Sequence, residues 1–244
     1  MPHKPTMIML IALFVAGATN AAECVSIFNG KDLSGWTVKA VPADADKNFW
    51  SVEHGAILAN SVGQPDHDYV CLLTDKEYEN FVLALEFQAF RNCQGNSGVQ
   101  IRSRYDNKEN WLDGPQIDIN PPGYWRCGMI WDETRDNTRW LYPEIPKGTW
   151  VDTTMAVDGI KFYYSENEPA WNSLEIIADG PRLKAVMNGI TIMEWDGDGV
   201  LNDDNHRKYN VGIKGHIALQ IHKNDELKIR FRNIKIKELE DGWK

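Results

Sequence analysis

Cysteine is scarce in this sequence, and its spacing excludes a common class of site. The 244 residues include four cysteines, at positions 24, 71, 93 and 127. None forms a CxxC pair or another spacing typical of metal ligands, so we expect no zinc site. No partner group marks one of the thiols as a nucleophile. Four cysteines permit three disulfide pairings, and the sequence does not choose between a disulfide and simply buried thiols.

Positive charge is also in short supply. Lysine and arginine total 26 against 35 acidic residues, which gives a formal net charge of −9. An acidic chain is a poor partner for phosphate backbones or anionic lipid. We therefore expect no nucleic-acid partner and no binding to a membrane surface.

Only one long apolar run is present, and it lies at the start of the chain. Lys4 precedes Met7–Ala18 (MIMLIALFVAGA), and small residues follow the run. This is the layout of a secretory signal peptide over residues 1–22, because the run is too short to span a bilayer comfortably. An N-terminal membrane anchor is the alternative. A lipid anchor on Cys24 is disfavoured, because Glu23 stands where a small residue is expected. The protein is thus predicted to be exported, to the periplasm or the extracellular space.

Residues 23–244 contain no repeat, linker, low-complexity stretch or sustained helical periodicity, and their length suits one domain. Without the first 22 residues the charge balance is 25 minus 35, or −10. Short apolar runs separated by turn residues predict an all-β sandwich. Asn188-Gly189, between two such runs, predicts a type I′ hairpin turn. The runs are 80–90, 98–104, 116–120, 153–157, 173–178, 182–187, 215–222 and 229–239.

Three of these runs alternate between apolar and polar residues: GVQIRSR, QIDIN and GHIALQIH. Successive side chains of a strand point to opposite faces, so each run has an apolar and a polar face. A solvated outer face is one interpretation. These polar faces are rich in side chains with fixed hydrogen-bonding geometry, which favours a ligand-binding concave sheet. They carry Gln100, Arg102, Arg104, Gln116, Asp118, Asn120, His216, Gln220 and His222.

Aromatic residues favour a carbohydrate ligand. The chain has ten tryptophans and eight tyrosines, and an aromatic ring offers a flat platform to a sugar ring. Most are expected to pack in the core. Trp111, Trp125, Trp131 and Trp140 fall in a loop-rich region, where one or two can line a groove.

A series of motifs along the chain resembles the 3-keto-disaccharide hydrolase family. They are FNGKDLSGW, NSGVQIRSR, GPQIDI, WDETR, WNSLEIIADG, GHIALQIH and FRNIKIKEL, in the order of the family and spread over residues 23–244. The resemblance implies a concanavalin-like jelly-roll sandwich of two antiparallel sheets. It also implies an enzyme that cleaves glycosides already oxidised to a ketone at carbon 3. The bulky loop at residues 121–125, and Cys93 and Cys127 beside the expected groove, depart from the commoner family pattern.

The chemistry of such substrates indicates which groups the site needs. A ketone at C3 acidifies the proton on C2, so a base can remove it. The enolate then expels the substituent at C1, and water adds afterwards. The site therefore needs a base, a group that stabilises the enolate oxygen, and an acid for the leaving oxygen.

Family match and strand parity together assign candidates to these roles. Asp118 and His222 are expected to carry protons, Arg102 to clamp an oxyanion or hydroxyl, and Glu133 to join them as a catalytic residue from the WDETR loop. We expect Arg102, Asp118 and His222 to converge in one groove. Residues expected to bind substrate are Gln100, Gln116, Gln220, Arg135 and Trp131. Structural roles are the alternative for each, including a Glu133–Arg135 pair. No cofactor is expected. A divalent cation is the single exception that the sequence does not exclude.

Two other functions remain compatible with the sequence. A noncatalytic carbohydrate-binding module can share the fold, because fold does not fix function. An ordinary glycosidase with two carboxylates, Asp118 and Glu133, is the second. The oligomeric state and the sugar are not indicated.

The apolar run at the start of the chain makes one prediction testable. Protein expressed from the full sequence in a Gram-negative bacterium should be recovered from the periplasm with a new N-terminus near Glu23. Intact mass and N-terminal sequencing measure this directly. Periplasmic protein that still begins at Met1 would contradict it.

Overall fold

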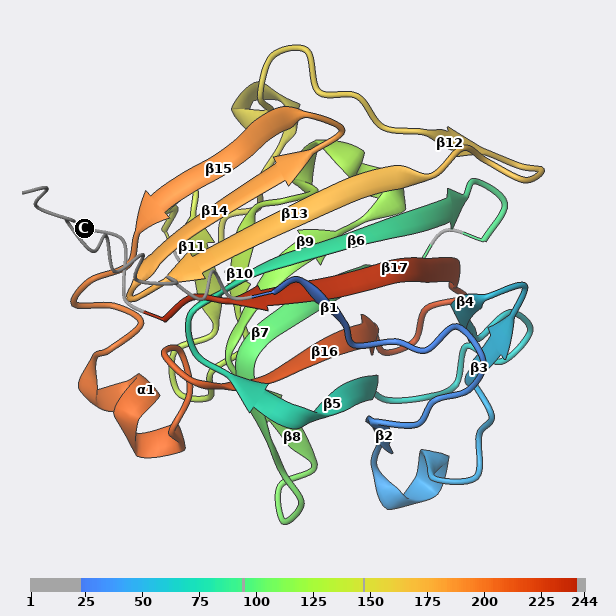
Figure 1. Ribbon diagram of the computed structural model, residues 1–244, viewed down its shortest axis with the longest axis horizontal. Coiled ribbons are helices and arrows are strands. Elements are labelled where there is room, and N and C mark those ends of the chain that lie inside the picture. The colour runs from blue at the N-terminus through green and yellow to red at the C-terminus, as the bar shows by residue number, and fades with distance from the viewer. Residues whose placement is uncertain (1–22, 94, 147, 241–244) are drawn as a thin grey trace, which may run out of the picture.

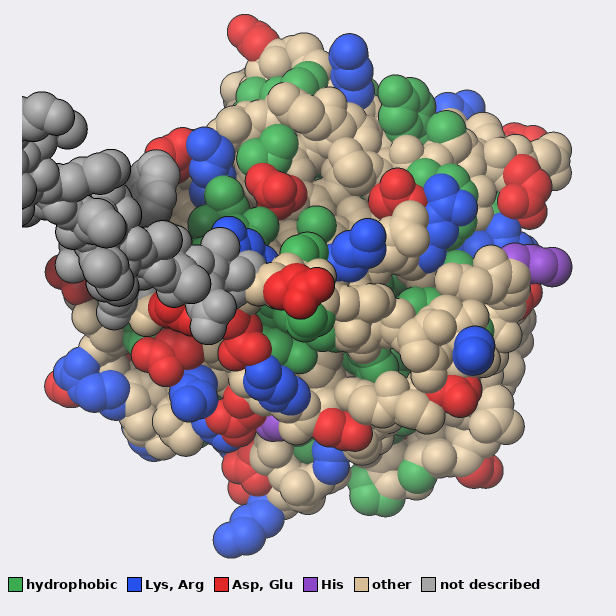
Figure 2. All heavy atoms as spheres, viewed as in Figure 1, with side chains coloured by type: hydrophobic (Ala, Val, Ile, Leu, Met, Phe, Trp, Pro, Cys, Tyr) green, Lys and Arg blue, Asp and Glu red, His purple; other side chains and the backbone are tan. Residues whose placement is uncertain are grey.

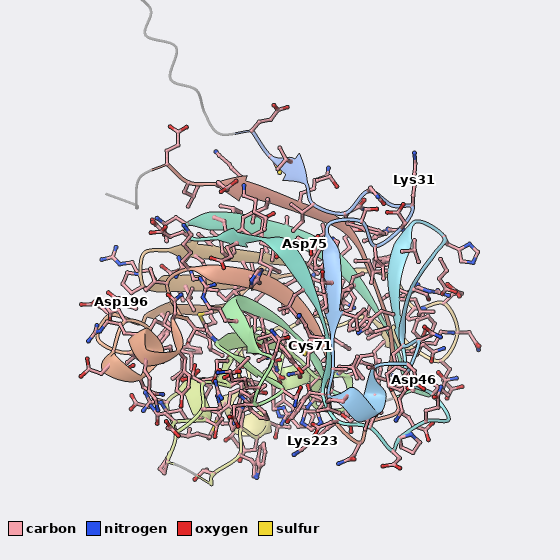
Figure 3. The ribbon with its side chains drawn as sticks, turned by 90° about the horizontal axis from the view of Figure 1, so that it is seen from below. Lys31, Asp46, Cys71, Asp75, Asp196 and Lys223 are labelled. Carbon is pink, nitrogen blue, oxygen red and sulfur yellow. The ribbon has the colours of Figure 1, made fainter. Side chains whose placement is uncertain are left out.

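Two β-sheets pack face to face in the computed structural model (Figure 1). It describes residues 23–240 except 94 and 147, so the predicted signal segment 1–22 lies outside the described residues. Strand pairing in the described residues is antiparallel, apart from a two-residue parallel contact between β12 (Tyr164–Ser165) and β6 (Phe81–Phe90). The predicted fold class, an all-β sandwich of two antiparallel sheets, is confirmed. Figure 3, turned by 90°, shows the sheets as layers, with Cys71 and Asp75 along one strand.

The first sheet has nine strands, and seven of them follow the order β15-β14-β13-β6-β17-β4-β3. β1 pairs with β17 at one end, and β12 pairs with β6. The strands are β1 (Val25–Ser26), β3 (Trp50–Glu53), β4 (Ala56–Asn60), β6 (Phe81–Phe90), β12 (Tyr164–Ser165), β13 (Asn172–Asp179), β14 (Arg182–Met187), β15 (Ile190–Asp196) and β17 (Lys228–Glu238). Charged side chains of both signs are scattered over its outer face (Figure 2).

The second sheet has eight strands, seven of them in the order β11-β10-β9-β7-β16-β5-β2, and β8 pairs with β7. The strands are β2 (Trp36–Lys39), β5 (Val70–Tyr78), β7 (Ser97–Asp106), β8 (Trp111–Asp113), β9 (Pro115–Ile119), β10 (Ile130–Asp132), β11 (Arg139–Tyr142) and β16 (Gly215–Ile221). The alternating runs of the sequence thus become three adjacent central strands, β9, β7 and β16.

Helical segments are few and short between residues 23 and 240, the part of the chain that the structure describes. They are the 3-10 helices η1 (Pro42–Asp44), η2 (Pro121–Arg126) and η3 (Thr153–Met155), and the α-helix α1 (Asp204–Tyr209). Among the residues that the structure describes, no helix is long and apolar enough to cross a membrane. The strand predicted over 153–157 is wrong. The Asp152 carboxylate accepts hydrogen bonds from the backbone and the hydroxyl of Thr154, at 2.8 and 2.6 Å, and this local cap replaces a strand ladder.

The apolar faces of the central strands lie between the two sheets, as their alternation predicts. Their Val, Ile and Leu side chains are fully buried in the main core. These residues are Val99, Ile101, Ile117, Ile119, Ile217, Leu219 and Ile221. Burial of each such side chain contributes roughly 1.5–3 kcal/mol. The opposite faces of the same strands are therefore turned away from this core.

The predicted hairpin turn at Asn188-Gly189 is present. The φ angles of the two residues are 49° and 79°, which is the left-handed region that a type I′ turn requires. The turn joins β14 to β15 with Met187 opposite Ile190.

A β-bulge interrupts β7 at Arg102. Gln100 lies opposite Ala218 of β16, but Ser103 lies opposite His216, so β7 has one residue more than its partner between these points. The φ angle of Arg102 is 51°. A bulge of this kind breaks the alternation of side chains along the strand. The face of Arg102 therefore cannot be read from the sequence by parity.

The Arg102 side chain is fully buried and holds loops together at one end of the sandwich. Its guanidinium donates to the carbonyls of Glu79 at 2.7 Å, Gly180 at 2.5 Å and Gly212 at 3.3 Å. A fourth bond goes to Asn80 Oδ1 at 3.2 Å. Burial lowers the pKa of Arg102 to about 10, which still leaves it charged at neutral pH.

Replacement of Arg102 should therefore destabilise the fold. Arg102→Ala leaves several buried oxygens without donors, and we expect a loss of roughly 3–5 kcal/mol, a fall in Tm on the order of 10 °C. Arg182→Ala is the control, because Arg182 is 61% exposed in its ion pair with Asp196. Differential scanning calorimetry measures both. A Tm of Arg102→Ala equal to that of the control would refute the structural role.

Candidate active site

A pocket of about 510 Å³ lies on the eight-stranded sheet, on the side turned away from the main core. Side chains of β8, β9, β10 and β11 meet there with loops next to β5, β7 and β16. Its lining combines carboxylates, aromatic rings, an imidazole and a guanidinium. The lining residues are Tyr69, Asn96, Trp111, Gln116, Asp118, Asn120, Pro122, Arg126, Trp131, Glu133, Thr138, Trp140, Trp150, His222 and Asp225.

A glycine shapes the floor of the pocket. Asp118 of β9 and Gln220 of β16 both lie opposite Gly98, which stands between them on β7. A Cβ atom at Gly98 would lie 2.3 Å from Cδ of Gln116. Only a residue without a side chain leaves room for Gln116 to lie across β7 beside Asp118.

Asp118 is the most deeply placed acid of this floor, with 2% of its surface exposed. Its backbone is held by a hydrogen bond from its N–H to the carbonyl of Met129, at 2.9 Å. Oδ2 lies 3.4 Å from Nε of Arg126. Burial raises the pKa of Asp118 to about 6, and the charges of Arg126 and His222 offset only part of that rise.

Glu133 lies directly after β10 and is 5% exposed. Its backbone carbonyl accepts from Nε1 of Trp111 at 2.7 Å, and its N–H donates to the carbonyl of Gly114 at 3.0 Å. Oε1 is 3.5 Å from Nε2 of Gln220. Burial raises the pKa of Glu133 to about 7, although hydrogen bonds from Trp131 and Gln220 act against it. A carboxyl group with such a pKa can give or take a proton near neutral pH.

His222 follows β16 and is held on both ring nitrogens. Nε2 lies 3.2 Å from the Tyr69 hydroxyl, and Nδ1 lies 2.9 Å from the carbonyl of Lys223 and 3.5 Å from Asp225 Oδ2. That Asp225 oxygen also accepts from the N–H of Asn96 at 2.7 Å. Burial would lower the pKa of His222, but the bond and charge of Asp225 outweigh it, so the pKa is raised.

Helix α1 fastens the segment that carries Glu133. His206 of α1 is fully buried, with Nε2 3.4 Å from Asp132 Oδ2 and Nδ1 2.9 Å from Asp203 Oδ1. Asn205 donates to the carbonyl of Arg135 at 2.9 Å. Asp132 and Arg135, which flank residues 133–134, are thus both bonded to α1, and these contacts fix the backbone of Glu133. The sequence signals for this helix are the capping residue Asp203 and the left-handed Asn210 at its end.

Two predicted site residues lie elsewhere. The prediction that Arg102 converges with Asp118 and His222 is wrong, because the bulge turns Arg102 toward the carbonyls of the loops at one end of the sandwich. Arg135 is not among the pocket residues. Its guanidinium instead binds Asp113 and Asp106 at 2.7 and 3.0 Å, and no Glu133–Arg135 pair forms among the described contacts.

The other predicted residues come together. Asp118, His222, Glu133, Gln116 and Trp131 all line the pocket. Gln220 and Gln100 lie at a small cavity of about 10 Å³ that Glu133 also lines. Their roles in catalysis or binding stay predictions.

Sequence reasoning missed several pocket residues. Arg126 lies at the end of η2, the bulky loop that the sequence marks as unusual. Asp225 and Tyr69 come from loops without a motif. Asp225 lies three residues after His222, whereas the contact of Tyr69 with His222 joins distant segments and is visible only in the fold. All four cysteines are free thiols, so of the two alternatives that the sequence left open, a disulfide does not form.

A metal centre has no evident ligands in the described part of the chain, where no three or more His, Cys, Asp or Glu side chains are grouped to hold an ion. The expectation that no cofactor is needed stays a prediction.

A family model described as the 3-keto-alpha-glucoside-1,2-lyase-like domain matches residues 23–237. The chain belongs to this family. The resemblance read from the motifs is thereby confirmed, and the family places the chain among carbohydrate-acting proteins. A search among curated proteins finds no match.

Solved structures share the fold. A protein of Parabacteroides distasonis, named as a candidate glycosyl hydrolase, is 23% identical with a TM-score of 0.58, over 89% of this chain and 94% of that chain. The carbohydrate-binding module CBM66 of Bacillus subtilis is 12% identical with a TM-score of 0.52, over 84% of this chain and 96% of that chain. At these identities the likeness extends to the fold alone.

The raised pKa of Glu133 makes the stability of the fold depend on pH. The folded state favours the neutral carboxyl group. The contribution of Glu133 to the free energy of unfolding is therefore complete below its unfolded pKa near 4.5 and is lost as pH rises through about 7. Glu133→Gln keeps the neutral form at every pH. The difference in free energy of unfolding between Glu133→Gln and wild type should therefore be about 2–3 kcal/mol larger at pH 8 than at pH 4.5, in favour of the variant.

Urea unfolding at the two pH values measures this difference. The control is Glu175→Gln, an exposed glutamate on β13. If Glu133→Gln and wild type differ by the same free energy at both pH values, the carboxyl does not titrate as the structure indicates.

Proposed function

We propose that this protein cleaves 3-keto-α-glucosides by elimination across C1 and C2. The observation that carries the proposal is one pocket with two buried carboxyl groups, Asp118 and Glu133, whose pKa values of about 6 and 7 lie close to neutrality. Environments that hold two acids at different proton affinities are typical of paired base and acid catalysts. The family description supplies the substrate class.

Asp118 is the general base in this proposal. With the lower pKa of the two, it is the group ionised first as pH rises. It removes the proton from C2, which the neighbouring C3 ketone makes acidic, and the electron pair moves onto the ketone oxygen as an enolate. Arg126, 3.4 Å from Asp118 Oδ2, keeps the carboxylate in place.

His222 stabilises the enolate oxygen. Its pKa is raised by Asp225, which favours the charged imidazolium at the wall of the pocket. A cation held by fixed hydrogen bonds stabilises developing negative charge better than mobile water does. This role replaces the one that the sequence assigned to Arg102.

Glu133 is the general acid. Because its pKa is the higher of the two, it keeps its proton when Asp118 has lost its own. As the enolate collapses, the bond from C1 to the leaving oxygen breaks, and Glu133 gives that oxygen its proton. The products are a free alcohol or sugar and a 3-keto sugar with a C1–C2 double bond.

Addition of water across this double bond would complete a net hydrolysis. Glu133, ionised after the elimination, takes a proton from water as the hydroxyl joins C1, and Asp118 returns a proton to C2, so that both groups regain their starting states. Elimination alone and elimination with hydration therefore use the same residues. With the predicted export signal, the activity would operate outside the cytoplasm.

Paired substrates test the reaction. The protein should cleave 3-keto-α-glucosides and leave the unoxidised α-glucosides intact, because only the ketone acidifies C2–H. Product analysis by mass spectrometry in D₂O separates elimination from direct displacement: once the proton on Asp118 has exchanged with solvent, hydration leaves deuterium at C2, whereas displacement leaves C2 unlabelled. Cleavage of the unoxidised sugars would select an ordinary glycosidase, and binding of keto sugars without turnover would select a binding module.

Variants then test the residue roles. Asp118→Asn, Glu133→Gln and His222→Ala should each lower kcat on the order of a hundredfold or more, while Glu175→Gln stays at the wild-type rate. The wild-type profile of kcat against pH should rise near pH 6 and fall above pH 7, as Asp118 and then Glu133 ionise. Wild-type kinetics in Asp118→Asn would remove that residue from the mechanism.

A further inference from the structure

Trp150 is exposed at the wall of the pocket. It is 66% exposed, the largest fraction among the exposed large apolar side chains of the described residues, and it lines the pocket. Apolar surface left open at a cleft is typical of a site that a ligand covers. No motif in the sequence points to this residue.

The indole of Trp150 is held in place before any ligand binds. It lies parallel to that of Trp131, with 6.2 Å between ring centroids and 9° between planes. Trp131 meets Trp140 edge to face, with centroids 5.2 Å apart. The next residue, Val151, is 5% exposed and packs in a cluster with Trp140 and Met129. A fixed ring loses little freedom on binding, so its contact is efficient.

The platform lies next to Glu133. Trp131, on which Trp150 stacks, is two residues before Glu133, and its indole is a hydrogen-bond donor to the Glu133 carboxyl group. Trp131 also lies opposite Gln116, the residue beside Asp118 on the floor. Trp131 therefore borders both the Glu133 carboxyl group and the floor at Gln116, and Trp150 stacks on it.

We propose that Trp150 and Trp131 form the subsite for the leaving group, and that this subsite selects leaving groups with a ring. The inference rests on the proposed function for the direction of the substrate, because Glu133 protonates the leaving oxygen and the rest of the leaving group lies beyond it. A second sugar ring or an aryl ring can lay its apolar face on Trp150. A methyl group is too small to reach it.

A set of 3-keto-α-glucosides with methyl, phenyl and glucosyl leaving groups tests the subsite. Trp150→Ala should lower kcat/KM about fivefold to tenfold for the two ring-bearing substrates and leave the methyl glucoside unchanged. Trp150→Phe should restore most of the loss. Trp171→Ala is the control, since Trp171 packs on Arg232 and is not a pocket residue. Equal effects on all three substrates, or none, would overturn the proposal.

Binding measurements separate failure of the subsite from failure of the reaction. If wild type cleaves none of the keto sugars, the proposed function fails, and calorimetric titration with unoxidised maltose and methyl α-glucoside tests the subsite alone. The expected result is tighter binding of the disaccharide, lost in Trp150→Ala. Equal affinities for the two sugars, or no binding of either, would overturn the subsite as well.

Discussion

The position of β7 between β9 and β16 governs both the stability and the chemistry of this protein. On one side of these three strands, fully buried Val, Ile and Leu side chains bind the two sheets together. On the other side, the same register sets Asp118, Gly98 and Gln220 in one row. A shift of one residue in this register would turn the apolar face outward and the polar face inward. The core and the pocket floor would therefore be lost together. The apolar side thus enforces the geometry of the polar side.

Placing acids on that floor works against folding. Asp118 and Glu133 are buried, and burial makes their ionised forms unfavourable, as their raised pKa values record. The unfavourable free energy of ionising these carboxyl groups is only partly offset by contacts with Arg126, Gln220 and His222. The apolar faces of the strands behind the floor are buried in the core, and this burial offsets the destabilisation by the two acids. Residues held at this cost are the ones to expect at a catalytic centre.

The alternating pattern of the sequence predicted pocket residues correctly where the backbone is a regular strand, and failed where it is not. Strand alternation placed Asp118 and Gln116 on the correct face, because β9 follows a simple period of two residues. The same rule failed for Arg102, where the bulge inserts an extra residue into β7. The WDETR motif found Glu133 and Trp131, although Trp131 lies on β10 and not in a loop as expected. Trp150 and Asp225 lie on loops whose path is set by contacts with distant segments, which no local pattern encodes.

The link between α1 and the Glu133 segment has a consequence for how the protein folds. α1 belongs to the connection from β15, at one end of the first sheet, to β16, in the middle of the second. His206 therefore reaches Asp132 only when strands of both sheets have taken their places. The link also closes a long loop between segments that are distant in the chain. A chain in which the connection from β15 to β16 is not docked would therefore lack this anchor on Glu133, so the complete set of pocket residues depends on both sheets being in place.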